Sequence, residues 1–318
     1  MRSALAFAPA TIGNVAVGFD LLGCALEGAG DRVRATLLER PVVEVSDVLR
    51  APRALGVADA ALARIPRDPR KNTAAVGLFA MIRELRLKRG FRLRIEKGIP
   101  LGSGMGGSAA SSVAAAVAAN ALLPRPLSKD QLLRYALLGE SAASGSMHAD
   151  NVAPCLYGGL TLAPCEEGGE VVRLPYPRDL VCVLVHPHLE LATRDMRRIL
   201  KPTVKLRDHV RQQSRLAGFL SGLYDKSWDR IGASLEDVLI EPQRAPKIRG
   251  FAAAKRAALA AGAAGFSISG SGPSVFAWVR GKARAAKVLR ATRAAFSAAG
   301  LDSEGWTSPV SAAGARVL

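Results

Sequence analysis

The segment PLGSGMGGSAAS, residues 100–111, is a glycine-rich turn that runs directly into the alanine-rich segment SVAAAVAANALL, residues 112–123. Glycine lacks a Cβ atom, so this backbone can bend sharply and approach a ligand with its amide groups pointing inward. The alanine-rich segment predicts a helix, whose N-terminus adds unpaired N–H groups and about half a positive charge. The two segments together predict a phosphate-binding loop at the start of a helix.

The loop formally matches GxGxxG, yet its context excludes the dinucleotide-binding type of loop. That type needs a second strand ending in Asp or Glu about 20 residues later. Here the breaker PRPLS, residues 124–128, follows, and another helix is predicted to start near Lys129. A Walker A loop is also excluded, because no GK[ST] follows the glycines. The remaining interpretations are a plain turn and a glycine and serine loop ending in Ser108, whose hydroxyl suits Mg²⁺ or a phosphate oxygen.

The composition predicts a cytoplasmic globular protein. The chain has 318 residues, of which 49% are hydrophobic, enough for one large or two ordinary domains. Its apolar stretches end well before the ~20 residues that a membrane span needs, and residues 1–14 lack the apolar region of a signal peptide. The four cysteines form no CxxC pair, which argues against a zinc site or a disulfide framework.

The net charge of +17 is the one compositional anomaly, because strongly basic chains often bind nucleic acid. The arginines are spread along the whole chain, however, and aromatic residues, which stack on bases, make up only 5% of it. We therefore expect a solvated basic surface that attracts anionic nucleotides, with no nucleic-acid partner and no membrane partner. A basic binding protein without catalytic activity is the alternative.

The order of apolar runs predicts an α+β fold in two parts. Residues 4–10, 31–39, 42–49 and 91–100 are expected to form strands, and residues 73–86, 112–123 and 131–144 to form helices. A second part begins near residues 175–177. It is expected to contain a strand over 180–186, helices across 193–240 and 250–262, a hairpin over 266–279 and a helix over 283–300.

Three segments carry a family resemblance. They are APATIGNVAVGFDLLGCAL (8–26), the glycine loop, and GFSISGSGPSVFAWV (265–279). In this order and spacing they resemble the three motifs of the galactokinase, homoserine kinase, mevalonate kinase and phosphomevalonate kinase (GHMP) superfamily. A fourth segment, SGSMHADNVAPCLYGG (144–159), resembles the homoserine kinases within it.

This resemblance extends over essentially the whole chain and implies both fold and activity. It implies an N-terminal mixed α+β ATP domain over residues 1–172 and a C-terminal ferredoxin-like α+β domain over residues 173–318, with substrate between them. The implied reaction is ATP-dependent phosphorylation of the side-chain hydroxyl of L-homoserine, a step towards threonine, and a homodimer is expected.

Homoserine carries an ammonium, a carboxylate and a hydroxyl, and the resemblance assigns residues to each charged group. Asn14 and Asp20 would hold the amino-acid head, with Asp20 facing the ammonium. Arg197 and Arg244 would hold the carboxylate, which suits the planar donor fork of arginine. Arg249 is a competitor for the role of Arg244.

The ATP and Mg²⁺ sites are implied in the same way. Ser108 and Glu140 would ligate Mg²⁺, Thr193 would lie near the γ-phosphate, and Asn72 is a candidate for the adenine pocket. The third motif is expected to support the phosphate loop by close backbone packing. The loop residues assigned to ATP are Pro100, Leu101, Gly102, Ser103, Gly104, Met105, Gly106, Gly107, Ser108, Ala109 and Ala110.

The HADN segment supplies His148 and Asn151 on the substrate side, with Asp150 supporting them. Asn151 stands near the place where mevalonate kinase is thought to have an Asp base, and an amide cannot accept a proton. We therefore predict direct transfer without a carboxylate base, in which Asn151, Thr193 and Arg197 act on the reacting groups and the hydroxyl proton passes to a phosphate oxygen. Phosphoryl transfer tolerates this, because positioning and charge neutralisation supply most of the catalysis.

Two departures from the family pattern stand out. The first motif reads IGNVAVGFD where SANLGPGFD is usual, so Ile12 replaces a small polar residue. The loop has Gly107 where a serine is usual, although glycine still supplies its backbone amide. A kinase of another small alcohol, such as shikimate or mevalonate, is the nearest alternative, but those substrates have no ammonium to pair with Asp20.

Overall fold

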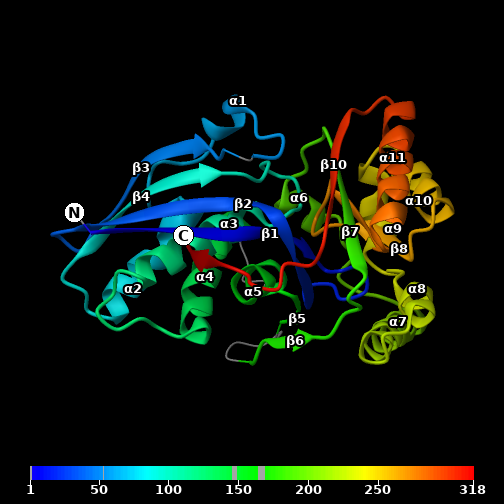
Figure 1. Ribbon diagram of the computed structural model, residues 1–318, viewed down its shortest axis with the longest axis horizontal. Coiled ribbons are helices and arrows are strands. Elements are labelled where there is room, and N and C mark those ends of the chain that lie inside the picture. The colour runs from blue at the N-terminus through cyan, green and yellow to red at the C-terminus, as the bar shows by residue number, and fades with distance from the viewer. Residues whose placement is uncertain (1, 53, 145–148, 164–168) are drawn as a thin grey trace.

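The computed structural model describes residues 2–52, 54–144, 149–163 and 169–318 (Figure 1). Two sheets organise these residues, and each sheet has helices packed on it. Figure 1 shows the first sheet with its helices on the left and the second sheet with its helices on the right.

The first sheet has seven strands among the described residues, in the order β11-β1-β2-β4-β3, with β5 and β6 continuing from β2. Neighbouring strands are antiparallel except for β3 and β4. The strands are β1 (Ser3–Gly13), β2 (Leu22–Leu38), β3 (Val43–Arg50), β4 (Gly90–Lys97), β5 (Leu160–Leu162), β6 (Val172–Leu174) and β11 (Arg316–Val317).

Alternation of apolar and charged residues places these strands. In β4 the side chains of Phe91, Leu93 and Ile95 are buried, whereas the intervening Arg92 and Arg94 are exposed. Successive side chains of a strand point to opposite faces, so one face of this sheet packs on helices and the other meets solvent. The four strands predicted in this part are confirmed.

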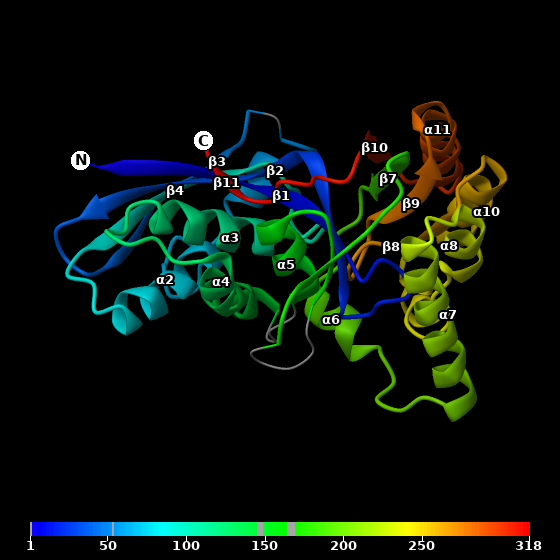
Figure 2. The ribbon, with the colours of Figure 1, turned by 60° about the horizontal axis from the view of Figure 1, so that its bottom comes forward.

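The first sheet is covered on one face by helices (Figure 2). Half of the residues in helix α3 are alanine. The helix is buried along almost its whole length, because small side chains allow the sheet and the neighbouring helices to approach it closely. The helices of this part are α1 (Asp59–Leu62), α2 (Thr73–Glu84), α3 (Gly107–Asn120), α4 (Lys129–Ser144) and α5 (Ala149–Tyr157).

The second sheet is antiparallel with the order β10-β7-β9-β8. Numbered within this sheet the order is 4-1-3-2, and helices follow its first and third strands, so the predicted ferredoxin-like arrangement is confirmed. Its strands are β7 (Leu180–Pro187), β8 (Gly265–Ile268), β9 (Val275–Arg280) and β10 (Ser303–Ser308). The helices are α6 (Thr193–Arg198), α7 (Leu206–Tyr224), α8 (Trp228–Ser234), α9 (Glu241–Arg244), the 3₁₀ helix η1 (Ala245–Lys247), α10 (Phe251–Ala260) and α11 (Lys282–Ala298).

Successive side chains of β9 point to opposite faces of the second sheet and pack against different helices. Val275, Ala277 and Val279 pack in the cluster that includes α10 and α11. Trp278 points to the other face, where its ring centroid lies 5.3 Å from that of Phe219 on α7. The second sheet is therefore packed between two layers of helices.

The chain changes sheet between Leu174 and Leu180, because β6 still pairs with β5 and β7 begins the second sheet. It returns at its end, where β11 pairs with β1 through Ala6 and Val317. The division at residues 172 and 173 stays a prediction.

Candidate active site

A cavity of about 450 Å³ lies where the phosphate loop meets the second sheet. Residues from the first part that line it lie in the first motif, between α1 and α2, at the start of α2, in β4, in the loop, in the first turns of α3, in α4 and in α5. The second part contributes residues of the β7–α6 connection, of α6, of α9 and of the third motif, namely Glu190, Thr193, Arg197, Arg244, Gly270 and Ser271. The volume is in the range of small-molecule sites.

The phosphate loop keeps its shape because it packs against two other motifs. Gly104 and Gly106 have left-handed φ angles of 78° and 69°. A Cβ atom on Gly104 would lie 2.4 Å from the carbonyl oxygen of Ser269, and one on Gly106 would lie 2.1 Å from Oγ1 of Thr11. Only glycine therefore fits at either place.

Hydrogen bonds hold the loop to the third motif. Oγ of Ser269 donates to the carbonyl of Gly104 at 2.7 Å, and the amide of Ser274 donates to the carbonyl of Ser103 at 3.1 Å. The predicted packing of this motif against the loop is confirmed. Ser271 and Gly270 of the same motif also line the cavity.

The loop residues assigned to ATP divide into two groups. Pro100, Leu101, Gly102, Ser103, Gly104, Gly106, Gly107 and Ser108 line the cavity. The side chains of Met105, Ala109 and Ala110 are buried in the core of the first part and do not line it.

A buried ion pair contacts the end of the phosphate loop at the start of α3. Nζ of Lys97, at the end of β4, donates to the Asp31 carboxylate, to the carbonyl of Gly107 at 2.8 Å and to Oγ of Ser111 at 2.9 Å. Oδ1 of Asp31 accepts the amide of Gly98 at 2.9 Å. Buried charges persist when they are paired and hydrogen-bonded in this way. This pair was not predicted from the sequence, although a lysine on the buried side of an alternating strand was a signal for it.

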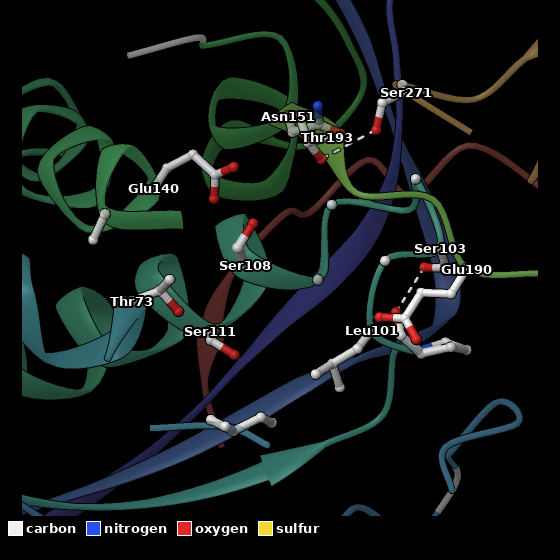
Figure 3. A pocket seen from close by; sticks show the side chains of 18 of the residues that line it. Thr73, Leu101, Ser103, Ser108, Ser111, Glu140, Asn151, Glu190, Thr193 and Ser271 are labelled. Carbon is white, nitrogen blue, oxygen red and sulfur yellow. Dashed lines mark hydrogen bonds between the residues drawn. The ribbon is translucent and has the colours of Figure 1, made fainter. Parts of the chain in front are cut away.

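Glu140 points from α4 towards Ser108 at the start of α3 (Figure 3). Burial raises the pKa of the Glu140 carboxyl to about 7, and the nearby Ser108 hydroxyl opposes that rise in the pKa. A hydroxyl and a carboxylate are the hard oxygen donors that Mg²⁺ prefers, with phosphate oxygens and water completing its shell. This donor set fits the ion, and the described residues contain no group of three or more His, Cys, Asp or Glu that could hold a metal by itself.

At the other end of the cavity Asp20 and Arg197 form a two-pronged ion pair. Nη1 and Nη2 of Arg197 donate to the two carboxylate oxygens of Asp20 at 3.0 and 2.9 Å. The side chain of Asn14 joins this end to the third motif, since its Nδ2 donates to the carbonyl of Gly270 at 2.8 Å and its Oδ1 accepts the amide of Asp20 at 2.9 Å. Asn14 and Asp20 have left-handed φ angles of 68° and 60°, which non-glycine residues adopt mainly at tight turns and functional sites.

Arg244, and not Arg249, reaches the cavity. Arg244 is 2% exposed and donates to the carbonyls of Met196 at 3.2 Å and Gly270 at 3.0 Å. Burial, together with the nearby charge of Arg197, lowers the pKa of Arg244 to about 10. Arg249 donates instead to the carbonyl of Gly300 in an exposed position.

Asn151 has its amide oriented by two neighbours. Oγ1 of Thr11 donates to its Oδ1 at 2.8 Å, and its Nδ2 donates to Oδ2 of Asp150 at 3.2 Å. Burial, followed by the charge of Asp20, raises the pKa of Asp150 to about 7. The role of Thr11 was not predicted from the sequence. His148 lies outside the described residues.

Thr193 is the first residue of α6 and lies one turn before Arg197, so both face the cavity. Oγ1 of Thr193 is 3.1 Å from Oγ of Ser271 (Figure 3). Asn72 also lines the cavity, but its Oδ1 accepts the amide of Ala74 at 3.0 Å and its Nδ2 donates to the carbonyl of Pro66 at 2.6 Å. Asn72 therefore caps α2, and its contact with adenine stays a prediction.

Comparisons with known proteins agree with this geometry. Residues 72–159 match the GHMP kinases N terminal domain, and residues 219–298 match the GHMP kinases C terminal domain. A homoserine kinase from Xylella fastidiosa shares 48% sequence identity with this chain, in an alignment that covers the whole chain and 94% of the relative. A homoserine kinase from Chlorobium phaeobacteroides shares 41% identity, in an alignment that covers both chains completely. The crystal structure of homoserine kinase from Cytophaga hutchinsonii aligns with all of this chain and 98% of its own, with a TM-score of 0.93 and 39% identity. The chain belongs to the homoserine kinases of the GHMP kinase family.

Membership of the GHMP kinases implies ATP as a substrate, together with a small molecule that accepts the phosphoryl group. None of the helices within the described ranges is both long and apolar enough to span a lipid bilayer.

One further contact of this GHMP kinase was not expected from the sequence. Nη2 of Arg64 is 2.8 Å from Oε2 of Glu190, and both residues line the cavity. Glu190 also lies against Gly102, since a Cβ on that glycine would be 2.8 Å from Cγ of Glu190. This pair links the segment after α1 to the connection between β7 and α6 at the phosphate loop.

Proposed function

We propose that this GHMP kinase transfers the γ-phosphoryl group of ATP to the side-chain hydroxyl of L-homoserine, forming O-phospho-L-homoserine for threonine synthesis. The convergence of Asp20, Arg197 and Arg244 at one end of the cavity, with the phosphate loop at the other, carries the proposal. The names of the relatives, which are homoserine kinases at 48% and 41% identity, support it.

The pair of Asp20 and Arg197 suits a zwitterionic substrate. In the absence of substrate each charge is satisfied by the other. An amino acid brings an ammonium for Asp20 and a carboxylate for Arg197 and Arg244, so each of these charges has a partner when substrate binds. An acid without an ammonium, such as shikimate or mevalonate, would bring no cation to Asp20 in exchange for Arg197 and would gain less binding free energy, which disfavours that alternative.

The nucleotide binds, in this proposal, with its phosphates on the amides of the glycine loop and on the N-terminus of α3. Ser108 and Glu140 would hold Mg²⁺, and the charge of a bound Mg²⁺ ion would neutralise the phosphate oxygens. Thr193 places its hydroxyl beside the transferred group, and Asn72 borders the adenine.

Transfer proceeds directly and in line, without a carboxylate base. Asn151 directs its amide to the reacting groups. Its orientation is fixed because Thr11 donates to its Oδ1 and its Nδ2 donates to Asp150. The bond from the substrate oxygen to phosphorus forms as the bond from phosphorus to the ADP oxygen breaks, and the hydroxyl proton passes to a phosphate oxygen. Positioning and charge neutralisation supply most of the acceleration in such a reaction.

ADP release from Mg·ATP tests this function, with L-homoserine, shikimate, mevalonate and galactose as acceptors and the Arg197→Ala variant as a control. We expect turnover with homoserine alone and its loss in the variant. Turnover with a different alcohol would overturn the substrate assignment and retain the kinase. No turnover, together with a salt-sensitive shift of DNA or RNA, would favour the basic binding protein.

Three features stay predictions of this proposal. They are the homodimer, which sedimentation velocity tests, the cytoplasmic location and the lack of a nucleic-acid partner.

A further inference from the structure

Phe19 of the first motif is in contact with both arginines at the amino-acid end of the cavity. The guanidinium carbon of Arg197 is 5.5 Å from the centroid of the Phe19 ring, and that of Arg244 is 5.3 Å from it. Both distances are within the ~6 Å at which a cation is attracted to an aromatic face. Phe19 is half-buried and directly precedes Asp20 in the chain.

The two arginines differ in how their charges are compensated. Arg197 pairs with Asp20 through two hydrogen bonds, whereas Arg244 donates to the backbone carbonyls of Met196 and Gly270. Arg244 is buried, and the charge of Arg197 is one of the causes that lower its pKa. Like charges that must converge on one carboxylate therefore repel each other while no ligand is bound.

An aromatic ring suits this place because its faces are electron-rich and it brings no charge of its own. A carboxylate at the position of Phe19 would hold the arginines but compete with the substrate for them. The ring attracts both guanidinium groups and leaves their N–H donors available to a ligand.

We propose that Phe19 is a positioning residue that holds Arg197 and Arg244 in the spacing and direction needed to bind one substrate carboxylate. Phe19 does not line the large cavity among the described residues and instead borders a neighbouring cavity of about 10 Å³ together with Arg244. It acts through the arginines, not by touching the substrate. This inference rests on the proposed function, because it assumes an amino-acid substrate.

The test compares Phe19→Leu with Phe19→Tyr. Leucine keeps an apolar side chain but removes the ring, whereas tyrosine keeps the ring. We expect Phe19→Leu to raise the KM for L-homoserine about ten-fold, in line with the loss of two cation–π contacts, and to change the KM for ATP and kcat less than about two-fold. Phe19→Tyr should stay within about three-fold of the wild type for every constant.

Phe7→Leu is a matched control. Phe7 also contacts an arginine, with the guanidinium carbon of Arg316 4.8 Å from its ring centroid, but it lies on β1 and does not line the cavity. The same substitution should therefore leave the KM for L-homoserine unchanged. Thermal unfolding midpoints of all variants show whether each is folded.

A second experiment separates positioning from general damage. The compound 3-aminopropan-1-ol has the hydroxyl and ammonium of homoserine but no carboxylate, and it is used as a competitive inhibitor against L-homoserine. We expect its inhibition constant to be the same in the wild type and in Phe19→Leu, because it does not use the arginines.

Three results would overturn the role of Phe19. They are an unchanged KM for L-homoserine in Phe19→Leu, an equal rise in the KM values for both substrates, and a Phe19→Tyr variant as impaired as Phe19→Leu. A wild-type enzyme that does not phosphorylate L-homoserine would instead refute the proposed function, so the two failures are distinguishable.

Discussion

Asn151 and Asp150 are neighbours in the chain and carry an amide and a carboxyl of similar shape, yet the structure gives them different surroundings. The Asn151 amide accepts a hydrogen bond from Thr11 and donates one to Asp150, so each end of it is assigned. Asp150 is 4% exposed and has a raised pKa. Residue type alone predicts the chemistry of these groups, and only the surroundings decide their orientation and charge.

The substitution Asn151→Asp should not raise turnover. A carboxylate at this position would lie beside Asp150 and the phosphates of ATP, and like charges at a buried site oppose each other. We expect the single-turnover rate of phosphoryl transfer, measured by rapid quench, to fall at least about ten-fold. A faster rate would show that the reaction benefits from a carboxylate base and would contradict the mechanism.

Asp150 should make the stability of the protein depend on pH. Its carboxyl has a pKa of about 7 in the folded protein and an ordinary value of 3.8. At a pH between these two pKa values, the carboxyl is ionised in the unfolded chain but still protonated in the folded protein. A rise in pH through this range therefore lowers the free energy of unfolding, by at most about 4 kcal/mol for this group.

Asp150→Asn removes this dependence. We expect the variant to gain more free energy of unfolding in urea at pH 8 than at pH 5, relative to the wild type. Asp59→Asn, at a side chain that is 83% exposed, is the surface control. An equal effect of Asp150→Asn at both pH values would show that the carboxyl does not titrate in this range.

At the scale of elements, the phosphate loop and the strands and helices around it depend on each other. The glycines permit its turns, the third motif holds its carbonyls, and the pair of Lys97 and Asp31 supports the start of α3. The loop was predictable from its composition, because glycine content and a following helix are local signals. Its supports were less predictable, since they come from β2, β4 and the β8–β9 connection.

Two adjacent glycines of the loop should respond differently to substitution. In Gly106→Ala the new Cβ would lie 2.1 Å from Oγ1 of Thr11, in a backbone with φ of 69°. In Gly107→Ala it would lie 3.3 Å from Cγ2 of Ile99, at the first residue of α3. We expect kcat/KM for ATP to fall at least about 100-fold in the first variant and less than about three-fold in the second.

Gly107→Ser extends this comparison, because it restores the serine that is usual in the family. It should also stay close to the wild type. Equal losses at Gly106 and Gly107 would contradict the steric argument.

The connection between β7 and α6 should affect nucleotide binding through Glu190. The Glu190 carboxylate lies against the phosphate loop, where it would repel the triphosphate. It also forms an ion pair with Arg64. We expect Glu190→Gln to lower the KM for ATP about two- to five-fold, with a smaller effect at high salt because both side chains are about half exposed. The change of another exposed carboxylate, Asp195→Gln, controls for net charge. A raised KM for ATP in Glu190→Gln would show that the ion pair itself is required for binding.

At the scale of the whole molecule, the net charge of +17 should act on ATP and not on the amino acid. Mg·ATP is an anion, whereas L-homoserine has no net charge at neutral pH. Salt screens the attraction between the protein and an anion, with a Debye length of about 10 Å at 0.1 M. Between 50 and 300 mM KCl we expect the KM for ATP to rise about three-fold and that for L-homoserine to stay nearly constant. Equal changes in both would show that the net charge does not attract the nucleotide.

The sequence by itself determined the motifs of this kinase and most of its longer helices and strands, whereas β10 and the short elements α1, α5, β5, β6 and β11 were not predicted. Alternation in β4, helical spacing in α4 and the glycines of the phosphate loop are all properties of neighbouring residues, so local sequence suffices to predict them. The four motif segments likewise identified the family, whereas the roles that this resemblance assigns to single residues stay predictions.

Tertiary structure alone decided how the residues at those ends meet. Thr11 binds Asn151 across 140 positions, Gly104 binds Ser269 across 165, and Asp20 pairs with Arg197 across 177. Phe19 beside two arginines and Arg64 beside Glu190 arise in the same way. Periodicity cannot show such contacts, because they depend on how two sheets, each formed from local signals, pack against each other around the cavity.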